Sequence, residues 1–256
     1  MIDIHSHILF GVDDGPKTID ETILMLEQAV KEGITEIIST SHSCHPQFNV
    51  TSEQVLNQIA TLQGALNTQQ IPLKLHTGHE VRLVEDLVEK IASKEVLLLG
   101  NSNYLLLELP SSNVPKYTRE MIIRLQENGI TPIIAHPERN KMIAERPQKL
   151  EELIREGAVA QITAGSLAGH FGSSVQKLSL NLVKANLVHC YGSDVHNLQT
   201  RPFLFDAGLT YLEKNKQLDA VDILLENNAR IIENKGFILY EPESIQQKKW
   251  WNIFAK

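Results

Sequence analysis

The chain has 256 residues, of which 42% are hydrophobic and 21% are charged. This much apolar material can form a sizeable core, which excludes an intrinsically disordered chain. The 31 acidic residues outnumber the 24 basic ones and give a net charge of −7, which excludes binding to nucleic acid or to anionic lipid through a basic surface.

The sequence also indicates a cellular compartment. No uninterrupted apolar run approaches the roughly 18–20 residues of a membrane span, so we expect no membrane insertion. The N-terminus lacks a basic region followed by an apolar stretch, and we expect no export signal. Cys44 and Cys190 are the two cysteines, too few for a disulfide scaffold and typical of a reducing compartment. We therefore expect a cytoplasmic protein.

Short β-branched or aliphatic runs alternate with longer amphipathic segments along the chain. Strands are expected at 2–5, 36–40, 73–77, 104–109, 132–135, 159–163 and 187–191. Helices are expected at 19–32, 52–68, 82–92, 117–128, 148–156 and 174–185, with two more at 203–215 and 218–227. The strand runs are nearly continuous in apolar character, as in a parallel sheet that is covered on both faces.

Capping signals support several of these boundaries. Thr18-Ile19-Asp20-Glu21 and Thr51-Ser52-Glu53-Gln54 have the pattern of capping boxes, which satisfy free N–H groups in a first helical turn. Gly33, Gly129 and Gly157 stand where three of the predicted helices end. Because glycine adopts the left-handed conformation at little cost, each is expected to terminate its helix just before a strand.

Strand–helix alternation with short links predicts an α/β fold with parallel strands and right-handed crossovers. About seven such units favour a closed or nearly closed barrel, and an open doubly wound sheet is the alternative. No linker or change of composition divides the chain, so we expect a single domain over residues 1–256. The aromatic tail at 248–254 is expected to dock on the barrel or on a neighbouring subunit, in which case the chain would form a homo-oligomer.

Histidines and carboxylates follow nearly every predicted strand at its C-terminal end. They are His5, His7, His42, Glu80, Glu108, His136, Asp194 and His196, joined by Asp13 or Asp14 from the first loop. In an α/β barrel these strand ends meet at one rim, where active sites are assembled. Carboxylates in an apolar barrel mouth are costly unless cations compensate their charge. The pattern therefore predicts a metal centre.

The number and type of these side chains indicate the metals. Catalytic sites use about three protein ligands per ion, so nine ligands suit two or three divalent ions with a bridging carboxylate. Imidazole and carboxylate without thiolate favour Mn, Fe or Zn. Arg139 and Arg201 follow His136 and His196 closely in the sequence. A guanidinium group beside such a centre favours an anionic substrate, with phosphate as the best geometric match.

Cysteine-based phosphatase chemistry is excluded by spacing. It needs a cysteine with an arginine six residues later, so that the thiolate lies in an anion-binding loop. The residue six positions after Cys44 is Val50, and the residue six positions after Cys190 is His196. Both thiols are therefore expected to be inert packing residues.

The motifs together resemble a known superfamily. They are His5-Ser6-His7-Ile8-Leu9-Phe10-Gly11-Val12-Asp13-Asp14-Gly15, Ser41-His42, Glu80, Glu108, His136-Pro137-Glu138-Arg139 and Ser193-Asp194-Val195-His196-Asn197. This set is similar to that of the polymerase-and-histidinol-phosphatase (PHP) superfamily. Within it, the chain most resembles the bacterial manganese-dependent protein-tyrosine phosphatases of capsule and exopolysaccharide operons.

The resemblance implies a distorted (β/α)7 TIM-like barrel of the PHP fold with a trinuclear Mn²⁺ site, Fe or Zn being alternatives. One ion would be held by His5, His7, Glu80 and Asp194, a second by Glu80, Glu108 and His136, and the third by Asp14, His42 and His196. The choice of Asp14 over Asp13 comes from the family pattern alone. Arg139 and Arg201 would grip the phosphoryl oxygens, and His42 is a further candidate catalytic residue.

The implied reaction is hydrolysis of phosphotyrosine by a metal-activated hydroxide that attacks phosphorus in line. The implied substrate is the tyrosine-rich tail of a bacterial tyrosine kinase, and the role is regulation of capsular or exopolysaccharide synthesis.

Three alternatives remain at this point. The nearest is a histidinol-phosphate or other small-molecule phosphatase of the same superfamily. A metal-dependent amidohydrolase also begins with His-x-His, but those enzymes often place a lysine where this chain has Glu108. A catalytically dead barrel would lack ligands, and none is missing here.

Five other histidines, His45, His76, His79, His170 and His189, fit no ligand position better than those already named. His45 and His170 lie in predicted loops over the rim and could contact substrate. His76 has the parity of Glu80 and could support it inside the barrel, whereas strand alternation turns His79 to the opposite side.

Overall fold

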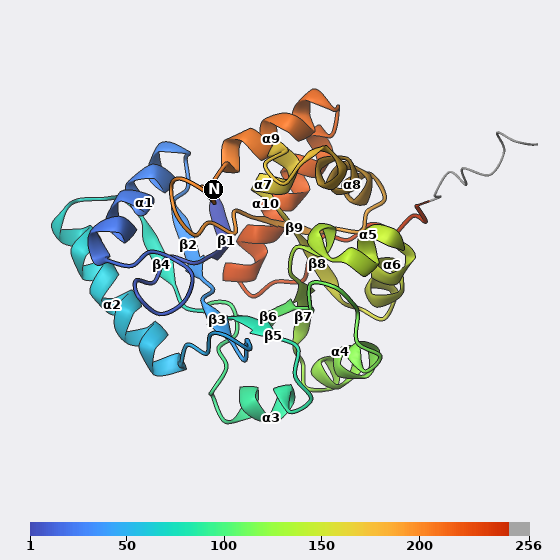
Figure 1. Cartoon of the computed structure of the whole chain (residues 1–256), viewed down its shortest axis with the longest axis horizontal. Coiled ribbons are helices and arrows are strands. Elements are labelled where there is room, and N and C mark those ends of the chain that lie inside the picture. The colour runs from blue at the N-terminus through green and yellow to red at the C-terminus, as the bar shows by residue number, and fades with distance from the viewer. Residues whose placement is uncertain (246–256) are drawn as a thin grey trace, which may run out of the picture.

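The structure is a computed structural model that describes residues 1–245. Strands occupy the centre of the molecule and helices surround them (Figure 1). Within the described residues, none of the helices is both long enough and apolar enough to cross a membrane. The aromatic tail at 248–254, predicted to dock on the barrel or on a second subunit, lies outside the described residues.

The strands form two parallel sheets. They are β1 (Ile2–Ser6), β2 (Glu36–Ser39), β3 (His42–Ser43), β4 (Lys74–His76), β5 (Glu80–Arg82), β6 (Tyr104–Glu108), β7 (Thr131–Ile134), β8 (Val159–Thr163) and β9 (Cys190–Gly192). One sheet has the order β1-β2-β4 and the other has the order β3-β5-β6-β7-β8-β9. Each of these pairings is parallel, as the strand–helix alternation predicts.

Backbone hydrogen bonds continue one sheet into the other. The Thr40 N–H donates to the carbonyl of Ser6 at 2.8 Å, and the Glu80 N–H donates to the carbonyl of Thr40 at 3.1 Å. Beyond β9, a parallel bridge pairs Ser6 with Val195, whose carbonyl accepts from the His7 N–H at 2.9 Å. The parallel sheet is therefore curled, and the segment after the last strand lies against the first. The predicted α/β class is confirmed.

Helices connect the strands on the outside of the curled sheet. They are α1 (Ile19–Lys31), α2 (Ser52–Thr68), α3 (Leu87–Ala92), α4 (Thr118–Glu127), α5 (Lys141–Glu145), α6 (Gln148–Arg155), α7 (Ala164–Ala168), α8 (Ser173–Lys184), α9 (Phe205–Lys214) and α10 (Leu218–Ile232), with a 3-10 turn, η1 (Pro137–Arg139). Helix α2 has the predicted bounds. The short α5 and α7 were not predicted, because five residues carry too little periodicity to be recognised.

The capping predictions are confirmed in most details. Thr51 and Gln54 form a complete capping box at the start of α2. At α1 only half of the predicted box forms. The Thr18 hydroxyl accepts from the Glu21 N–H as predicted. The Glu21 carboxylate, however, accepts from the Lys17 N–H at 2.6 Å instead of from the Thr18 N–H. The predicted terminating glycines have positive φ angles, +79° at Gly33, +73° at Gly129 and +96° at Gly157.

Three predicted elements have wrong bounds. The helix expected at 218–227 continues to Ile232. The expected helix at 82–92 begins only at Leu87, because Arg82 belongs to β5 and pairs in register with Glu108 of β6. The expected strand at 187–191 is displaced to Cys190–Gly192, where the ladder with β8 forms. The two-residue strand β3 also escaped prediction, since its pairing with β5 is a tertiary contact.

Strand residues alternate between two apolar clusters. Leu105, Leu107 and Ile134 belong to the larger cluster, which also contains the buried faces of the helices. Leu106 and Ile133 belong to the smaller cluster, together with buried residues of β1, β2, β8 and β9. Both faces of the strands are therefore packed, which explains their continuous apolar runs.

Two glycines in helices offer a test of this packing. A Cβ at Gly208 of α9 would collide with the Tyr191 hydroxyl and lie 2.9 Å from the Ala164 carbonyl oxygen, whereas a Cβ at Gly64 of α2 would meet nothing within 4 Å. We expect Gly208→Ala to lower the free energy of unfolding by about 2 kcal/mol. The control Gly64→Ala is expected to raise it by about 0.5–1 kcal/mol. Urea denaturation of both variants measures the difference, and equal effects would contradict the packing described.

Candidate metal centre

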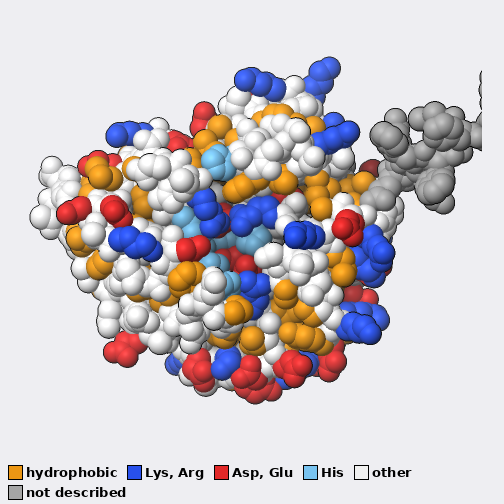
Figure 2. Space-filling view, viewed as in Figure 1, with side chains coloured by type: hydrophobic (Ala, Val, Ile, Leu, Met, Phe, Trp, Pro, Cys, Tyr) orange, Lys and Arg blue, Asp and Glu red, His pale blue; other side chains and the backbone are white. Residues whose placement is uncertain are grey.

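The candidate centre lies at the carboxyl end of β6 and around the two short strands β3 and β5. Glu108 is the last residue of β6, Glu80 opens the short β5, and His42 opens β3. His136 and Asp194 follow β7 and β9 in the left-handed region, with φ angles of +33° and +54°. Such backbone conformations are costly for residues other than glycine and concentrate at functional sites. In Figure 2 a hollow at the centre of the visible face contains histidine, acidic and basic side chains.

Glu80 occupies the middle of the histidines. Its Oε2 lies 3.5 Å from His5 Nε2, 3.3 Å from His7 Nε2 and 3.1 Å from His42 Nδ1, and its Oε1 lies 2.7 Å from His136 Nε2. Burial alone would raise the pKa of this carboxyl, but the imidazoles, led by His5, hold the pKa well below its usual range. One anionic carboxylate is thus positioned to be shared among four imidazoles.

Asp194 connects the histidines to the two predicted arginines. Its Oδ1 lies 3.3 Å from His5 Nε2, and its Oδ2 accepts hydrogen bonds from Arg201 Nη2 at 2.6 Å and from Arg139 Nη1. Burial opposes ionisation, but Arg139 and Arg201 outweigh it and hold the pKa of Asp194 well below its usual range. The arginines predicted to bind an anion are therefore already directed at one.

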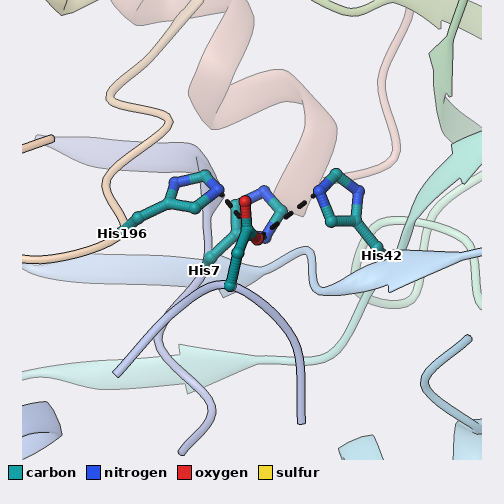
Figure 3. A group of neighbouring side chains, drawn as sticks. His7, His42 and His196 are labelled. Atoms are coloured by element: carbon teal, nitrogen blue, oxygen red, sulfur yellow. Dashed lines mark ion pairs between the residues drawn. The ribbon is translucent and has the colours of Figure 1, made fainter. Parts of the chain in front are cut away.

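A third group surrounds Asp14. His7, His42 and His196 converge on one region of the site (Figure 3). Asp14 Oδ1 lies 3.2 Å from His196 Nε2 and 3.6 Å from His42 Nε2. The Asp14 side chain is 38% exposed, so this group is the most open to solvent.

Glu108 and Arg82 form the remaining side of the centre. Glu108 Oε2 lies 3.1 Å from Arg82 Nε and 4.0 Å from His42 Nδ1. Burial and then the charge of Glu80 raise the pKa of Glu108. Arg82 was not predicted as a site residue, and only the register that places it opposite Glu108 could have indicated it.

The structure thus brings all nine predicted ligands together. They fall into four overlapping groups whose ligand atoms lie within 4.8 Å of one another: His7, Asp14, His42 and His196; His5, His7 and Glu80; His5, His136 and Asp194; and His42, Glu80 and Glu108. Arg139 and Arg201 adjoin the same centre through Asp194.

The hydrogen bonding of the histidine rings shows that these groups fit metal ions. The Nδ1 atoms of His5, His7 and His196 are held by Gln161 Oε1 at 3.0 Å, Asp13 Oδ2 at 3.1 Å and the Asp194 carbonyl at 3.0 Å. The acceptors at Nδ1 assign the proton there and leave the lone pair on Nε2. In the described part of the chain, these three buried Nε2 atoms make no hydrogen bond. Unpartnered nitrogens with fixed tautomers are typical of metal ligands.

The backbone separates the roles of the two first-loop aspartates. Asp13 accepts from the Gly15 N–H, from the His42 N–H and from His7 Nδ1, so it supports ligands rather than facing them. Asp14 faces His196 and His42. Asp13 and Gln161 are the supporting residues that the sequence did not reveal as such.

The other histidines divide between the rim and the remainder of the fold. His45 stacks on His42 with ring centroids 4.6 Å apart, and His170 hydrogen-bonds the Thr200 carbonyl, so both lie at the rim. The idea that His76 supports Glu80 was wrong, because its Nε2 pairs with Glu36, the first residue of β2, at 2.6 Å. His79 points elsewhere, accepting from the Leu97 N–H.

Comparisons with known proteins agree with this geometry. The family described as "Capsular polysaccharide synthesis, CpsB/CapC" matches residues 1–233. CapC of Staphylococcus aureus is 38% identical over 99% of this chain and 100% of its own length, and the tyrosine-protein phosphatase YwqE of Bacillus subtilis is 37% identical over the same shares. A crystal structure from work on YwqE of Bacillus subtilis and CpsB of Streptococcus pneumoniae, called metal-dependent tyrosine phosphatases, has a TM-score of 0.94. It is 37% identical and covers 96% of this chain and 100% of its own.

Proposed function

The chain belongs to the CpsB/CapC family of capsular polysaccharide synthesis, and we propose that it is a metal-dependent protein-tyrosine phosphatase of that pathway. The kinship with bacterial tyrosine phosphatases of capsule operons, predicted from the sequence motifs, is thereby confirmed. The observation that carries the proposal is the convergence of five histidines and four carboxylates on one site with two arginines beside it.

We propose the following ligands for two or three divalent ions, with Mn²⁺ as the preferred metal: His5, His7, Asp14, His42, Glu80, Glu108, His136, Asp194 and His196. Imidazoles mixed with carboxylates suit such ions. When bound, the ions supply positive charge to the phosphoryl group and activate water as the nucleophile. Glu80 lies near four of the histidines, which supports its role as a bridging ligand.

Arg139 and Arg201 are proposed to bind the phosphoryl oxygens. Both guanidinium groups reach the same oxygen of Asp194 in the structure, so their N–H groups are aimed at a shared anionic position. The planar fork of a guanidinium matches phosphate oxygens and stabilises the charge that they carry during transfer. His42 is proposed to be catalytic as well as a ligand, since its ring lies between Asp14 and Glu80.

The protein substrate requires space beside this centre. A pocket of about 360 Å³ adjoins Asp14 and is lined in part by Lys17, Leu24 and Gln199. It could accept residues that flank a phosphotyrosine, which supports a peptide substrate such as the tail of a bacterial tyrosine kinase.

The proposal also includes a cytoplasmic location, a homo-oligomer, a single domain over 1–256 and a closed (β/α)7 barrel of the PHP type. The bridge between Ser6 and Val195 supports closure of the barrel.

The direct test compares substrates and metal states. We expect the Mn(II)-loaded protein to hydrolyse a phosphotyrosine peptide with a higher kcat/KM than histidinol phosphate. Chelation followed by desalting is expected to lower turnover at least about a hundredfold, because the nucleophile and the charge on the phosphoryl group both depend on the ions. Readdition of Mn(II) is expected to restore it. Equal activity in chelator would reject the metal chemistry, and a preference for histidinol phosphate would assign the protein to the small-molecule phosphatases.

A further inference from the structure

Two phenylalanines lie at the metal centre instead of in the core. In the described part of the chain, the others lie in or against the two apolar clusters; these are Phe10, Phe203, Phe205 and Phe237. Phe48 and Phe171 belong to neither cluster. Phe48 contacts the ring of His42, and Phe171 lies under the guanidinium of Arg139. Because neither ring is needed to fill the core, their place at the site calls for another explanation.

The loop that carries Phe48 is held in a fixed shape. It leaves β3 through Cys44, whose φ angle of +57° reverses the chain. The Cys44 N–H donates to Asn49 Oδ1 at 2.8 Å, and the Val50 N–H donates to the His42 carbonyl at 2.9 Å. These two bonds tie the end of the loop to its beginning, so Phe48 returns to the histidine from which the loop departs.

Three rings form a compact cluster with nearly parallel planes as a result. The His42 and His45 centroids are 4.6 Å apart, and Phe48 lies 5.7 Å from His45 and 5.8 Å from His42. The three ring planes agree within 22°. His42 is buried, whereas His45 and Phe48 are partly exposed, so these two rings lie between the metal centre and solvent. His45 is fixed by the Gln47 N–H, which donates to its Nδ1 at 3.2 Å.

We propose that Phe48, supported by His45, is the aryl-binding wall of the active site and makes the enzyme selective for phosphotyrosine over alkyl phosphates. This inference rests on the proposed phosphatase function. The phenyl ring of phosphotyrosine is joined to phosphorus through a single oxygen, so a phosphoryl group beside His42 places the ring within reach of the residues stacked on that histidine. Offset aromatic pairs are favourable at centroid separations of about 4.5–7 Å. A phosphoserine side chain has no ring and gains nothing from this wall.

Phe171 provides a matched control. The Arg139 guanidinium lies 4.9 Å from the centroid of its ring, a cation–π contact that fixes the arginine. Arg139 is proposed to bind the phosphoryl group, which all phosphomonoesters share. Loss of Phe171 is therefore expected to lower kcat/KM for aryl and alkyl substrates equally.

The test measures selectivity in the Mn(II)-loaded protein. One peptide is used with phosphotyrosine or phosphoserine, and phenylphosphonate and methylphosphonate serve as inert ligands. We expect Phe48→Ala to lower kcat/KM for the phosphotyrosine peptide roughly tenfold. The kcat/KM for the phosphoserine peptide is expected to stay within about twofold of the wild-type value. The preference for phenylphosphonate over methylphosphonate is expected to fall by a similar factor. Phe48→Tyr is expected to keep both preferences. Phe171→Ala is expected to lower kcat/KM for both peptides without changing the ratio of the two values.

The outcomes separate this inference from the proposed function. The aryl wall would be overturned if Phe48→Ala lowered kcat/KM equally for both peptides. It would also be overturned if the affinity ratio of phenylphosphonate to methylphosphonate were unchanged in Phe48→Ala. Bound Mn and the thermal midpoint are measured for each variant, and Phe48→Leu replaces Phe48→Ala if the latter loses metal, with the same ratio deciding. A wild-type protein that does not hydrolyse phosphotyrosine, but still prefers phenylphosphonate through Phe48, would reject the proposed function and retain the wall.

Discussion

Glu80→Gln is expected to reduce phosphatase turnover at least about a thousandfold, which corresponds to about 4 kcal/mol of activation free energy. Both oxygens of Glu80 face imidazoles, with His136 at 2.7 Å and His42 at 3.1 Å. The amide removes the negative charge that offsets the cations and places an N–H₂ group where an acceptor is needed. Because the carboxylate adjoins two of the proposed metal groups, bound metal is expected to fall together with turnover.

Steady-state kinetics and metal analysis of the purified variant test this result. Glu36→Gln is the control, because Glu36 also pairs with a histidine, His76, but at the start of β2, away from the centre. Its activity and metal content are expected to match the wild type within about twofold. Full metal content in Glu80→Gln would show that the carboxylate is not a ligand.

Arg139→Ala is expected to lower kcat/KM for phosphotyrosine by about 10²–10³-fold while the metal stays bound. A preorganised donor directed at developing charge contributes at about this level. Asp194 keeps its partner Arg201, so the fold and the ligand set should persist. Arg139→Lys is expected to recover less than a tenth of the loss, because an ammonium group cannot reproduce the planar fork of a guanidinium.

Arg119→Ala provides the surface control for this prediction. The Arg119 side chain is 68% exposed and pairs with Glu156 on the outside of the molecule. Its kinetics should equal those of the wild type. If Arg139→Ala retained wild-type kcat/KM, phosphoryl binding would have to be assigned to other groups, with Arg201 and Arg82 the next to test.

The strand-end pattern carried most of the information about the site. His5, Glu108 and Asp194 could be predicted to lie together because apolar strands that end in an imidazole or carboxylate are unusual, and parallel topology gathers such ends at one rim. The choice between Asp13 and Asp14 could not be made from spacing. It depends on the path of the first loop, which turns Asp13 toward His7 Nδ1 and Asp14 toward His196.

The residues that escaped prediction depend on contacts between distant segments. Arg82 was placed in a helix because the residues after it are amphipathic, but its pairing opposite Glu108 draws it into β5. Gln161 gave no signal of its own, since a single amide in a strand is ordinary, and its contact with His5 spans 156 residues. Local patterns determine the elements and their order, whereas supporting hydrogen bonds of this kind arise only when the curled sheet is assembled.

The closure of β1 against the segment after β9 has a consequence for biosynthesis. His5 and His7 are synthesised before Asp194 and His196, from which almost two hundred residues separate them. The Asp194 N–H donates to the carbonyl of His5, so the nascent chain cannot assemble the candidate site before Asp194 and His196 have been synthesised. Until then His5 lacks one of its two carboxylate neighbours, Asp194, and such long-range pairing is slow to form. We therefore expect the nascent chain to be inactive until the segment after β9 has been synthesised and has paired with β1.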